Sequence, residues 1–305
     1  MTATSATSSA THPDILCIGS VLWDIIGRAP SHMRQGSDVP GRISRLPGGV
    51  AWNIAMTLAR FGLRPAALSA IGQDVEGDEL MTACREMGAI MDYVYRSADL
   101  PTDTYMAVEG KNGLIAAIAD AHSLEAAGDK ILAPLENGTL GSGAAPYGGL
   151  IALDGNLTQR LLDQIARSPL FAAADLRVAP ASPGKAERLM PFLMHSRAVL
   201  YVNLEEAGYL CQTEFTSSEA AAEGLLARGA ARALVTDGGN AASDGTAEGV
   251  ITQQPPAVLV TRVTGAGDTF MAAHIVAESQ GASRDEALSR ALTAAAKYVS
   301  GEHAT

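Results

Sequence analysis

Apolar segments of strand length alternate with amphipathic segments of helix length along most of this chain, and no other feature of the sequence limits the fold as strongly. Ile15–Val21, Ala66–Ile71 and Leu150–Asp154 are apolar runs, whereas Val50–Phe61 and Gly77–Met87 repeat apolar residues at helical spacing. Strands that are apolar on both faces belong to a sheet that helices cover on both sides. The sequence therefore predicts an α/β fold in three layers, an α/β/α sandwich with a mostly parallel central sheet.

The same alternation continues toward the C-terminus. Further predicted strands are Leu170–Ala174, Ala198–Val202, Ala231–Thr236, Gly249–Thr252 and Ala257–Val260, and the last two predicted helices are Asp268–Glu278 and Arg284–Val299. The tract of residues 136–149 is interpreted as a loop, because it is too short to mark a domain boundary. We therefore expect one domain at residues 13–305, preceded by a disordered tail of small and polar residues at 1–12.

An antiparallel insertion interrupts the alternation. Tyr93–Tyr95, Thr104–Val108 and Leu114–Ala119 have strand character, and Lys111-Asn112-Gly113 is a hairpin turn between the last two. A hairpin inserted in an α/β chain is typical of a lid over a binding site. The lid is therefore predicted within residues 92–120.

Composition limits the classes of partner. The chain has 305 residues, 47% of them hydrophobic, and its formal net charge is −11. It is long enough to bury a large core. The negative charge and the lack of any Lys/Arg cluster argue against a polymeric nucleic acid or an anionic membrane as a partner.

Cysteine and histidine usage favours a cytoplasmic protein without zinc. Cys17, Cys84 and Cys211 are far apart and lack metal-binding or redox spacing, so we expect reduced core residues. The six histidines are scattered, with no pair at ligand spacing. The N-terminal run lacks the basic start and apolar stretch of a secretory signal, and no apolar stretch reaches membrane-spanning length.

A glycine-containing turn, Val263–Asp268, directly precedes an apolar helical pattern. Its glycines permit a tight bend whose backbone N–H groups point into one concavity, and the N-terminus of the following helix adds positive dipole character. The amides of Gly265, Ala266 and Gly267 would stabilise a phosphoryl group there. Asp268 would accept the proton of an attacking hydroxyl. The alternative is a structural turn in which Asp268 only caps the helix.

A second glycine-led segment, Pro47-Gly48-Gly49-Val50-Ala51-Trp52-Asn53-Ile54-Ala55, also runs into a helical pattern. Together the two segments resemble the paired signatures of the PfkB, or ribokinase-like, family of carbohydrate and nucleoside kinases, and the resemblance spans roughly Asp14 to Ser300. It implies a ribokinase-like fold with a small β lid and transfer of a phosphoryl group from ATP, with Mg²⁺, to an alcohol. It also adds residues 34–47 to the lid.

The resemblance places the acceptor near the first strand exit and the first glycine turn. Asp24 would accept hydrogen bonds from sugar hydroxyls. Gly48 and Gly49 would let a sugar approach the backbone closely, and Asn53 would bond a ring hydroxyl. From the residues alone, a turn capped by Asp24 and an ordinary helix start at Gly49 stay open as alternatives.

Asn203-Leu204-Glu205-Glu206 follows a predicted strand and matches the N-x-x-E motif of the family. The match implies that Asn203 binds the nucleotide phosphates and that Glu206 holds Mg²⁺, largely through water. A helix cap with acidic residues in the first turn is the alternative.

A further turn, Thr236–Ala241, resembles the nucleotide-side T-x-G-x-x-G turn of the family, with Ala241 in place of the final glycine. The resemblance implies that Thr236, Gly238 and Thr264 contact ATP phosphates. A second departure is Arg262-Val263, where many family members have Asp-Thr. Because that neighbourhood helps to hold a monovalent cation in many relatives, activation by K⁺ stays open.

The lid gives the clue to the acceptor. Thr102-Asp103-Thr104-Tyr105 and the later Asp120 resemble the pseudouridine-kinase branch of the family. This implies that Thr102, Thr104 and Asp120 face the nucleobase, where a carboxylate would accept from the N1–H that pseudouridine has and uridine lacks. The alternative is the polar outer face of a half-exposed hairpin. Lid strands also pair between subunits in this family, which implies a homodimer.

The implied function is phosphorylation of pseudouridine to pseudouridine 5′-phosphate. Ribose, adenosine, fructose and a keto-deoxy sugar acid stay open as acceptors. A non-catalytic sensor of the same fold is a second class, which the departures Ala241 and Arg262 favour and the intact Asp268 disfavours. A dinucleotide-dependent oxidoreductase ranks low, because Gly19-Ser20-Val21 replaces a G-x-G-x-x-G turn after the first strand.

Overall fold

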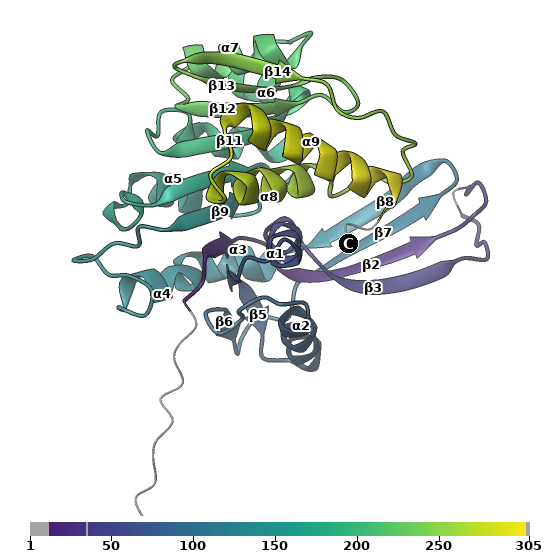
Figure 1. Ribbon diagram of the computed structural model, residues 1–305. Coiled ribbons are helices and arrows are strands. Elements are labelled where there is room, and N and C mark those ends of the chain that lie inside the picture. Colours follow the sequence, from purple (N-terminus) through teal and green to yellow (C-terminus); the bar gives the residue numbers. More distant parts are fainter. Residues whose placement is uncertain (1–11, 35, 303–305) are drawn as a thin grey trace, which may run out of the picture.

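Eight strands form the central sheet of the computed structural model, which describes residues 12–34 and 36–302 (Figure 1). In spatial order they are β14 (Gly249–Gln253), β13 (Ala242–Thr246), β12 (Arg232–Thr236), β11 (Ala198–Asn203), β10 (Asp175–Ala179), β9 (Leu150–Asp154), β1 (Ile15–Ile18) and β4 (Pro65–Leu68). The pairs from β12 to β4 are parallel, and β13 and β14 add antiparallel pairs at one edge. Apart from His12, the predicted tail lies outside the described residues.

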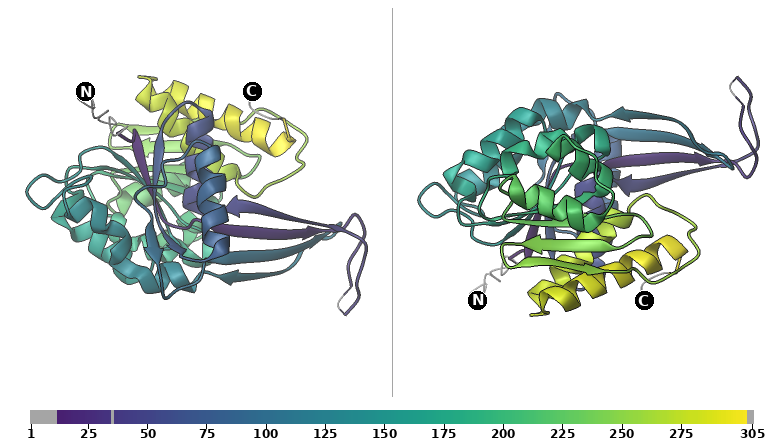
Figure 2. Two further views of the ribbon diagram at one scale, coloured as in Figure 1. Left: turned by 90° about the horizontal axis from the view of Figure 1, so that it is seen from below. Right: turned by 90° about the horizontal axis from the view of Figure 1, so that it is seen from above.

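Helices cover both faces of this sheet (Figures 1 and 2). One face packs against α1 (Val50–Arg60), α2 (Val75–Glu86), α8 (Ala266–Ser279) and α9 (Arg284–Ser300). The other packs against α3 (His122–Ala127), α4 (Ala133–Glu136), α5 (Gln159–Arg167), α6 (Leu204–Cys211), α7 (Ser218–Ala227) and the 3₁₀ helices η1 (Gly128–Leu132), η2 (Pro169–Phe171) and η3 (Pro183–Phe192). In β1, Ile15 and Cys17 enter the first core while Leu16 and Ile18 enter the second. The predicted α/β sandwich is confirmed.

Two predicted strands are wrong. Residues 170–174 do not form a strand, because the chain makes η2 there and β10 begins only at Asp175. Pro169 provides the φ of a helical turn but no N–H for a strand, and Phe171 is buried by packing rather than by sheet pairing. Ala257–Val260 runs without strand pairing, and Leu259 within it is 83% exposed.

The structure also contains strands that the pattern did not predict. β13 reads Ala-Ser-Asp-Gly-Thr, which is too polar for a strand pattern, yet Asp244 within it is fully buried. Its carboxylate accepts from Arg232 Nη2 at 2.7 Å and from Arg284 Nε at 3.2 Å. A buried charge is tolerated when it is paired in this way, and such pairing between distant residues leaves no trace in local periodicity.

A four-stranded sheet projects from the side of the main layers (Figure 2). This small sheet has the order β3 (Arg42–Gly48), β2 (Leu22–Arg28), β7 (Thr104–Gly110) and β8 (Gly113–Asp120). The predicted hairpin between β7 and β8 is confirmed, whereas β2 was not predicted. The strand near Tyr93–Tyr95 is β6 (Tyr95–Ser97), which pairs with β5 (Ala70–Gly72) outside the small sheet.

The register of the small sheet sorts its side chains onto two faces. Asp24 lies opposite Leu46 and Tyr105, so these three share one face. Met106 follows Tyr105 in β7 and pairs with Ile118 of β8, so the side chains of Met106 and Ile118 lie on the other face. On that face Ile118 is 67% exposed and Ile43 is 80% exposed. We call it the outer face of the small sheet; in the described residues it forms an uncovered apolar surface.

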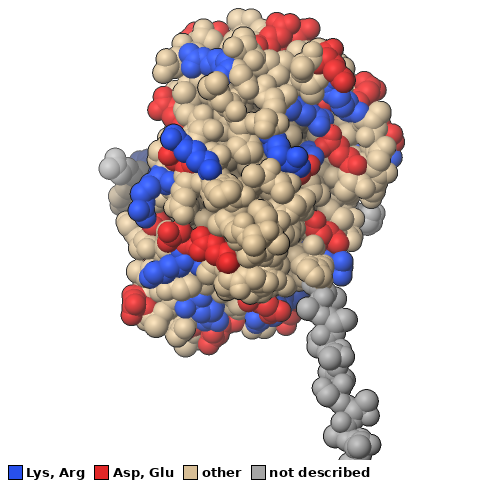
Figure 3. All heavy atoms as spheres, turned by 90° about the vertical axis from the view of Figure 1, so that its left-hand side faces the viewer, with Lys and Arg blue, Asp and Glu red and all other residues tan. Residues whose placement is uncertain are grey.

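The outer surface of the main layers shows no block of one charge on the side seen in Figure 3, where basic and acidic side chains are interspersed. The formal net charge of the chain is −11. None of the helices in the described residues combines the length and apolar character needed to cross a membrane.

Candidate active site

A cavity of about 460 Å³ lies beyond the carboxyl ends of β10, β11 and β12, at the N-terminus of α8. Ligands of open α/β sheets bind at this edge. The cavity brings together predicted residues from separate parts of the chain: Asn53, Asn203, Glu206, Thr236, Gly238, Thr264, Gly265, Ala266, Gly267 and Asp268. We therefore take it as the candidate active site.

The turn before α8 has the geometry of an anion-binding site. Gly265 is left-handed with a φ of 88°, and a Cβ there would lie 2.5 Å from Tyr298 Oη, so the position requires glycine. The Ala266 N–H is already engaged, since it donates within the turn at 3.1 Å. In the described residues, the backbone N–H groups of Gly267 and Asp268 have no acceptor and line the cavity.

Asp268 lies beside these donors and accepts a hydrogen bond from Asn53 Nδ2 at 2.9 Å. This bond joins two glycine-led segments that are 215 positions apart in the sequence. Burial raises the pKa of Asp268 to about 7; the charge of Asp154 adds to the rise, and the Asn53 bond opposes it. A carboxyl group with such a pKa, beside anion-binding donors, is suited to accept the proton of a hydroxyl.

Asn203 and Glu206 form a capping box at the start of α6. Glu206 N donates to Asn203 Oδ1, and Asn203 N donates to Glu206 Oε2, both at 2.8 Å. The alternative of a helix cap is therefore observed, but it leaves Asn203 Nδ2 and Glu206 Oε1 unused, and both residues also line the cavity. Burial raises the pKa of Glu206 to about 7, with the charges of Glu205 and Asp268 adding to the rise.

The turn after β12 forms the opposite wall of the cavity. Thr236 and Gly238 line it, and both also line an adjoining, mostly apolar hollow of about 340 Å³. The far side of that hollow is formed by Leu292, Ala295 and Val299 of α9. The two spaces share a wall, so a ligand with an anionic end and a flat apolar end would fill both.

Gly48 and Gly49 directly precede Val50, which lines this cavity, and Asp24 lies against Gly48 at the base of the small sheet. A Cβ at Gly48 would lie 2.1 Å from the Asp24 carboxyl group, and a Cβ at Gly49 would lie 2.4 Å from Ser20 O. Burial raises the pKa of Asp24 to about 6, and no donor in the described residues bonds its carboxylate. Asp24 is thus a half-buried acceptor that is available to ligand hydroxyls.

Asp154, the last residue of β9, was not predicted, although its place at a strand exit was a signal that could have found it. It is fully buried. Its carboxylate accepts from Ser20 N and Oγ at 2.8 Å, from Ala51 N at 2.9 Å and from Asn156 N at 2.8 Å. Asp154 therefore holds the β1 exit and the start of α1 together, which positions the Gly49 turn.

Three predicted base-contacting residues lie elsewhere. Thr102 donates through its backbone N–H to Asp74 Oδ2 at 2.7 Å, and its hydroxyl also donates to that carboxylate. Thr104 and Asp120 pair across β7 and β8 and project from the outer face, opposite to Asp24. The structure therefore does not bring these three side chains together with Asp24, and their contacts with a base stay predictions.

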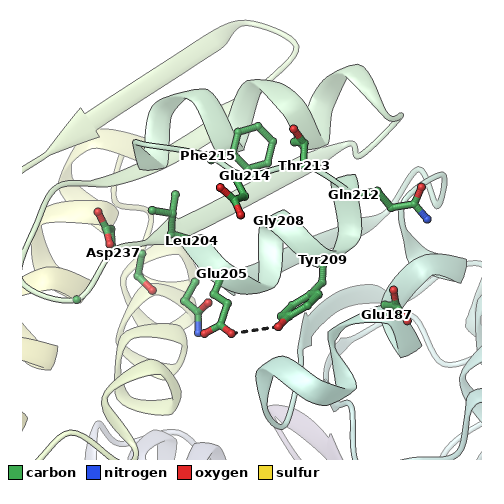
Figure 4. A pocket seen from close by; sticks show the side chains of 13 residues that line it. Glu187, Leu204, Glu205, Gly208, Tyr209, Gln212, Thr213, Glu214, Phe215 and Asp237 are labelled. Carbon is green, nitrogen blue, oxygen red and sulfur yellow. Dashed lines mark hydrogen bonds between the residues drawn. The ribbon is translucent and has the colours of Figure 1, made fainter.

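A larger, open hollow of about 900 Å³ adjoins the cavity on the α6 side (Figure 4). Four carboxylates line it, those of Glu187, Glu205, Glu214 and Asp237. Tyr209 Oη donates to Glu205 Oε1 at 3.3 Å (Figure 4). The smaller cavity has two carboxylates in its described lining, those of Glu206 and Asp268, so it repels phosphates less than this hollow, and we assign the chemistry to the smaller cavity.

The chain is similar to known proteins over nearly its whole length. The family model of the pfkB family carbohydrate kinases matches residues 12–305. The chain is 28% identical to the pseudouridine kinase of Escherichia coli (strain K12) over 267 residues, which cover 85% of this chain and 81% of that protein. It is 31% identical over 182 residues to the uncharacterized sugar kinase YeiI of the same organism, covering 58% of this chain and 47%, about half, of YeiI.

The fold has a solved counterpart. The structure of Arabidopsis thaliana ribokinase, complexed with ribose and ATP, aligns with a TM-score of 0.74 and 22% identity over 94% of this chain and 92% of that one. The expected ribokinase-like fold is thus confirmed. Since the family model spans nearly the whole chain, the protein belongs to the pfkB family of carbohydrate kinases and is a sugar or nucleoside kinase.

Proposed function

We propose that this kinase transfers a phosphoryl group from ATP to the 5′-hydroxyl of pseudouridine. The single observation that carries the proposal is the position of Asp268. Its carboxyl group, held by Asn53, lies next to the unpaired N–H groups of Gly267 and Asp268 in one cavity. A base and an anion-binding site are then within reach of the same reacting atoms.

In this mechanism the acceptor hydroxyl would give its proton to Asp268 as its oxygen forms a bond to the γ-phosphorus of ATP, and the bond from that phosphorus to the bridging oxygen of the β-phosphate would break to release ADP. The N–H groups at the N-terminus of α8 stabilise the charge on the transferring group. Asn53 orients the Asp268 carboxylate and keeps it from rotating away from the acceptor. Because these groups are positioned before the substrates bind, little reorganisation is needed during the reaction.

The nucleotide would occupy the cavity and the adjoining hollow together. Thr236, Gly238 and Thr264 line the cavity, where the phosphates would lie, and the apolar wall from α9 would cover the base. Asn203 Nδ2, which the capping box leaves unused, would donate to a phosphate oxygen.

Glu206 fits a role toward Mg²⁺. Its Oε1 has no partner in the described residues, its burial disfavours the charged form, and Asp268 is close enough to add to that effect. A divalent cation would relieve this repulsion, and carboxylate and phosphate oxygens are the ligands that Mg²⁺ prefers. When bound, Mg²⁺ would neutralise charge on the ATP phosphates.

The choice of pseudouridine as acceptor is supported by the similarity to the pseudouridine kinase of E. coli. Asp24 would accept from the ribose hydroxyls, and Gly48 would leave the space that its carboxyl group needs. We further propose that the small sheet acts as a lid that closes over the acceptor, since excluding water limits hydrolysis of ATP.

The test is coupled ADP release with Mg-ATP against pseudouridine, uridine, adenosine, ribose, fructose and a keto-deoxy sugar acid. We expect the largest kcat/KM with pseudouridine and a clear preference over uridine. A larger kcat/KM with another acceptor would identify that acceptor as the substrate and would leave the assignment as a kinase unchanged. Binding of pseudouridine, measured by calorimetry, without ADP release from any acceptor would favour a sensor instead.

We propose that two copies of the chain associate through the outer face of the small sheet. Ile43 and Ile118 on that face are exposed, and a second copy would bury them. Sedimentation velocity should show a dimer that Ile118→Lys converts to a monomer. Met194→Lys is the control, because Met194 is even more exposed than Ile118, at 84% against 67%, but lies outside the small sheet. A monomeric wild-type protein at high concentration would contradict the proposal.

We also propose a cytoplasmic location. Cys17, Cys84 and Cys211 are all buried and free, as expected in a reducing compartment. Thiol titration of the protein, denatured directly from cells, should find all three cysteines reduced; an oxidised cysteine would argue for a different compartment.

A further inference from the structure

The segment before the phosphate-binding turn is tied to the C-terminal end of α9. The backbone N–H groups of Thr261 and Arg262 donate to Val299 O at 2.8 and 3.2 Å. Arg262 Nε donates to Tyr298 O at 2.7 Å, and Tyr298 Oη donates to Thr264 O at 2.9 Å. The turn that binds the phosphoryl group therefore rests on the last helical turn of α9.

The Arg262 guanidinium lies where a cation is most favourable. It stacks on the Tyr298 ring, with its central carbon 3.8 Å from the ring centroid. It also faces the carbonyl end of a 17-residue helix, which carries the negative end of the helix dipole. A free metal ion would be attracted to the same carbonyl oxygens, but a side chain of the protein already supplies the charge.

The residues around this point do not fit the monovalent cation that the family resemblance implies. The carbonyl oxygens of Thr264, Tyr298 and Val299 already accept from donors of the chain. Arg60 and Arg262 line the adjoining hollow of about 290 Å³, and among the described residues of its lining Glu302 is the one carboxylate. A potassium ion placed there would meet a net positive charge.

We propose that Arg262 takes the place of a bound monovalent cation, and that its tethered charge holds the turn of residues 263–268 in its phosphate-binding form. Arg262 is a positioning residue, because it acts through the backbone of the turn and the hydroxyl of Tyr298. The kinase then works without K⁺ or Na⁺. Removal of the charge alone should create a cation requirement that the natural chain does not have.

The test compares the wild type with Arg262→Gln and Arg262→Lys. Gln keeps a hydrogen-bond donor without the charge, and Lys keeps the charge. The matched control is Arg290→Gln, which removes an exposed arginine of α9 that pairs with Glu286. Each protein is assayed in tetramethylammonium chloride and in potassium chloride at equal ionic strength, for Mg-ADP affinity by calorimetry and for kcat.

The wild type and Arg290→Gln should behave alike in both salts. Arg262→Gln should lose about tenfold in kcat in tetramethylammonium and recover most of it in potassium, since a hydrogen bond to a charged group is lost and a free cation can replace it. Its Mg-ADP affinity should follow the same pattern, and Arg262→Lys should need less potassium. Because Mg-ADP binding involves no acceptor, this outcome is independent of pseudouridine as the substrate.

Three outcomes would overturn the proposal: strong stimulation of the wild type by potassium, an Arg262→Gln protein that is unimpaired in tetramethylammonium, or a loss that no cation restores. The last would show that Arg262 has only a structural role. If Arg262→Gln does not fold, the potassium dependence of the wild type and of Arg262→Lys still tests the proposal.

Discussion

The proposed phosphate end and the proposed acceptor end of the candidate active site are held by different kinds of structure. At the phosphate end, Gly265, Asp268 and Glu206 lie at helix N-termini that pack into the main core, and each has a bonded neighbour. At the acceptor end, Asp24 projects from the small sheet, and its carboxylate has no partner in the described residues.

We expect this difference to separate the residues that act in phosphoryl transfer from the residues that recognise the acceptor. Groups that stabilise charge in the transition state work best when they are rigid before substrate arrives. The proposed lid, in contrast, would have to move to admit the acceptor, and the small sheet that would form it has one apolar face that is uncovered in the described residues. We therefore expect changes at the phosphate end to alter turnover and changes at the acceptor end to alter affinity.

The largest effect is expected from Asp268→Asn, which removes the proposed base. Turnover should fall by about 10²–10⁴-fold, the usual contribution of a positioned base, while the acceptor KM changes little. Steady-state kinetics measure both quantities. Asp163→Asn is the control, since Asp163 pairs with Arg167 on the exposed side of α5. Turnover near that of the wild type would remove Asp268 from the role of base.

A smaller effect, on acceptor affinity instead of turnover, is expected from Asp24→Asn. Loss of charged hydrogen bonds to the acceptor should lower kcat/KM by about 10–100-fold, mainly through KM. Glu109→Gln provides the control on the same sheet, because Glu109 pairs with Arg28 away from Asp24. If kcat falls and KM does not, the acceptor end is not the recognition site that we describe.

The pH dependence of turnover should show that the base is Asp268 at the phosphate end. Burial raises the pKa of Asp268 to about 7, so the carboxylate needed as base is lost as the pH falls through this value. The rate profile should therefore fall by about tenfold per pH unit on the acid side. Asp24→Asn should leave this limb in place, and a limb centred near the ordinary carboxyl value of 3.8 would contradict the assignment.

The smallest effect is expected in hydrogen exchange. Binding of the acceptor should slow exchange in β7 and β8 several-fold, because closure protects the small sheet, and should change exchange in α8 very little. Mass spectrometry of peptic peptides from both regions gives the comparison within one sample. Equal protection of the two regions, or none in β7 and β8, would show that the small sheet does not close.

More of the residues predicted for the phosphate end than of those predicted for the acceptor end come together in one cavity, for a physical reason. Helix starts and glycine turns are local structures, so a few neighbouring residues determine the geometry at Gly265, Asn203 and Glu206. The small sheet depends on pairing between distant strands, and its register decides which side chains share a face. Thr104 and Asp120 were thus grouped with Asp24 by motif, but the register puts them on the opposite face.

Local patterning by itself determined the layered α/β fold and the kinds of group at the site, because periodicity and turn chemistry act over a few residues. Only the tertiary structure decided which of these groups meet. The bond from Asn53 to Asp268, the three hydrogen bonds from Ser20 and Ala51 to Asp154 and the contact of Arg262 with the end of α9 all join residues far apart in the chain. Such contacts follow from how helices and strands pack, which no local pattern records.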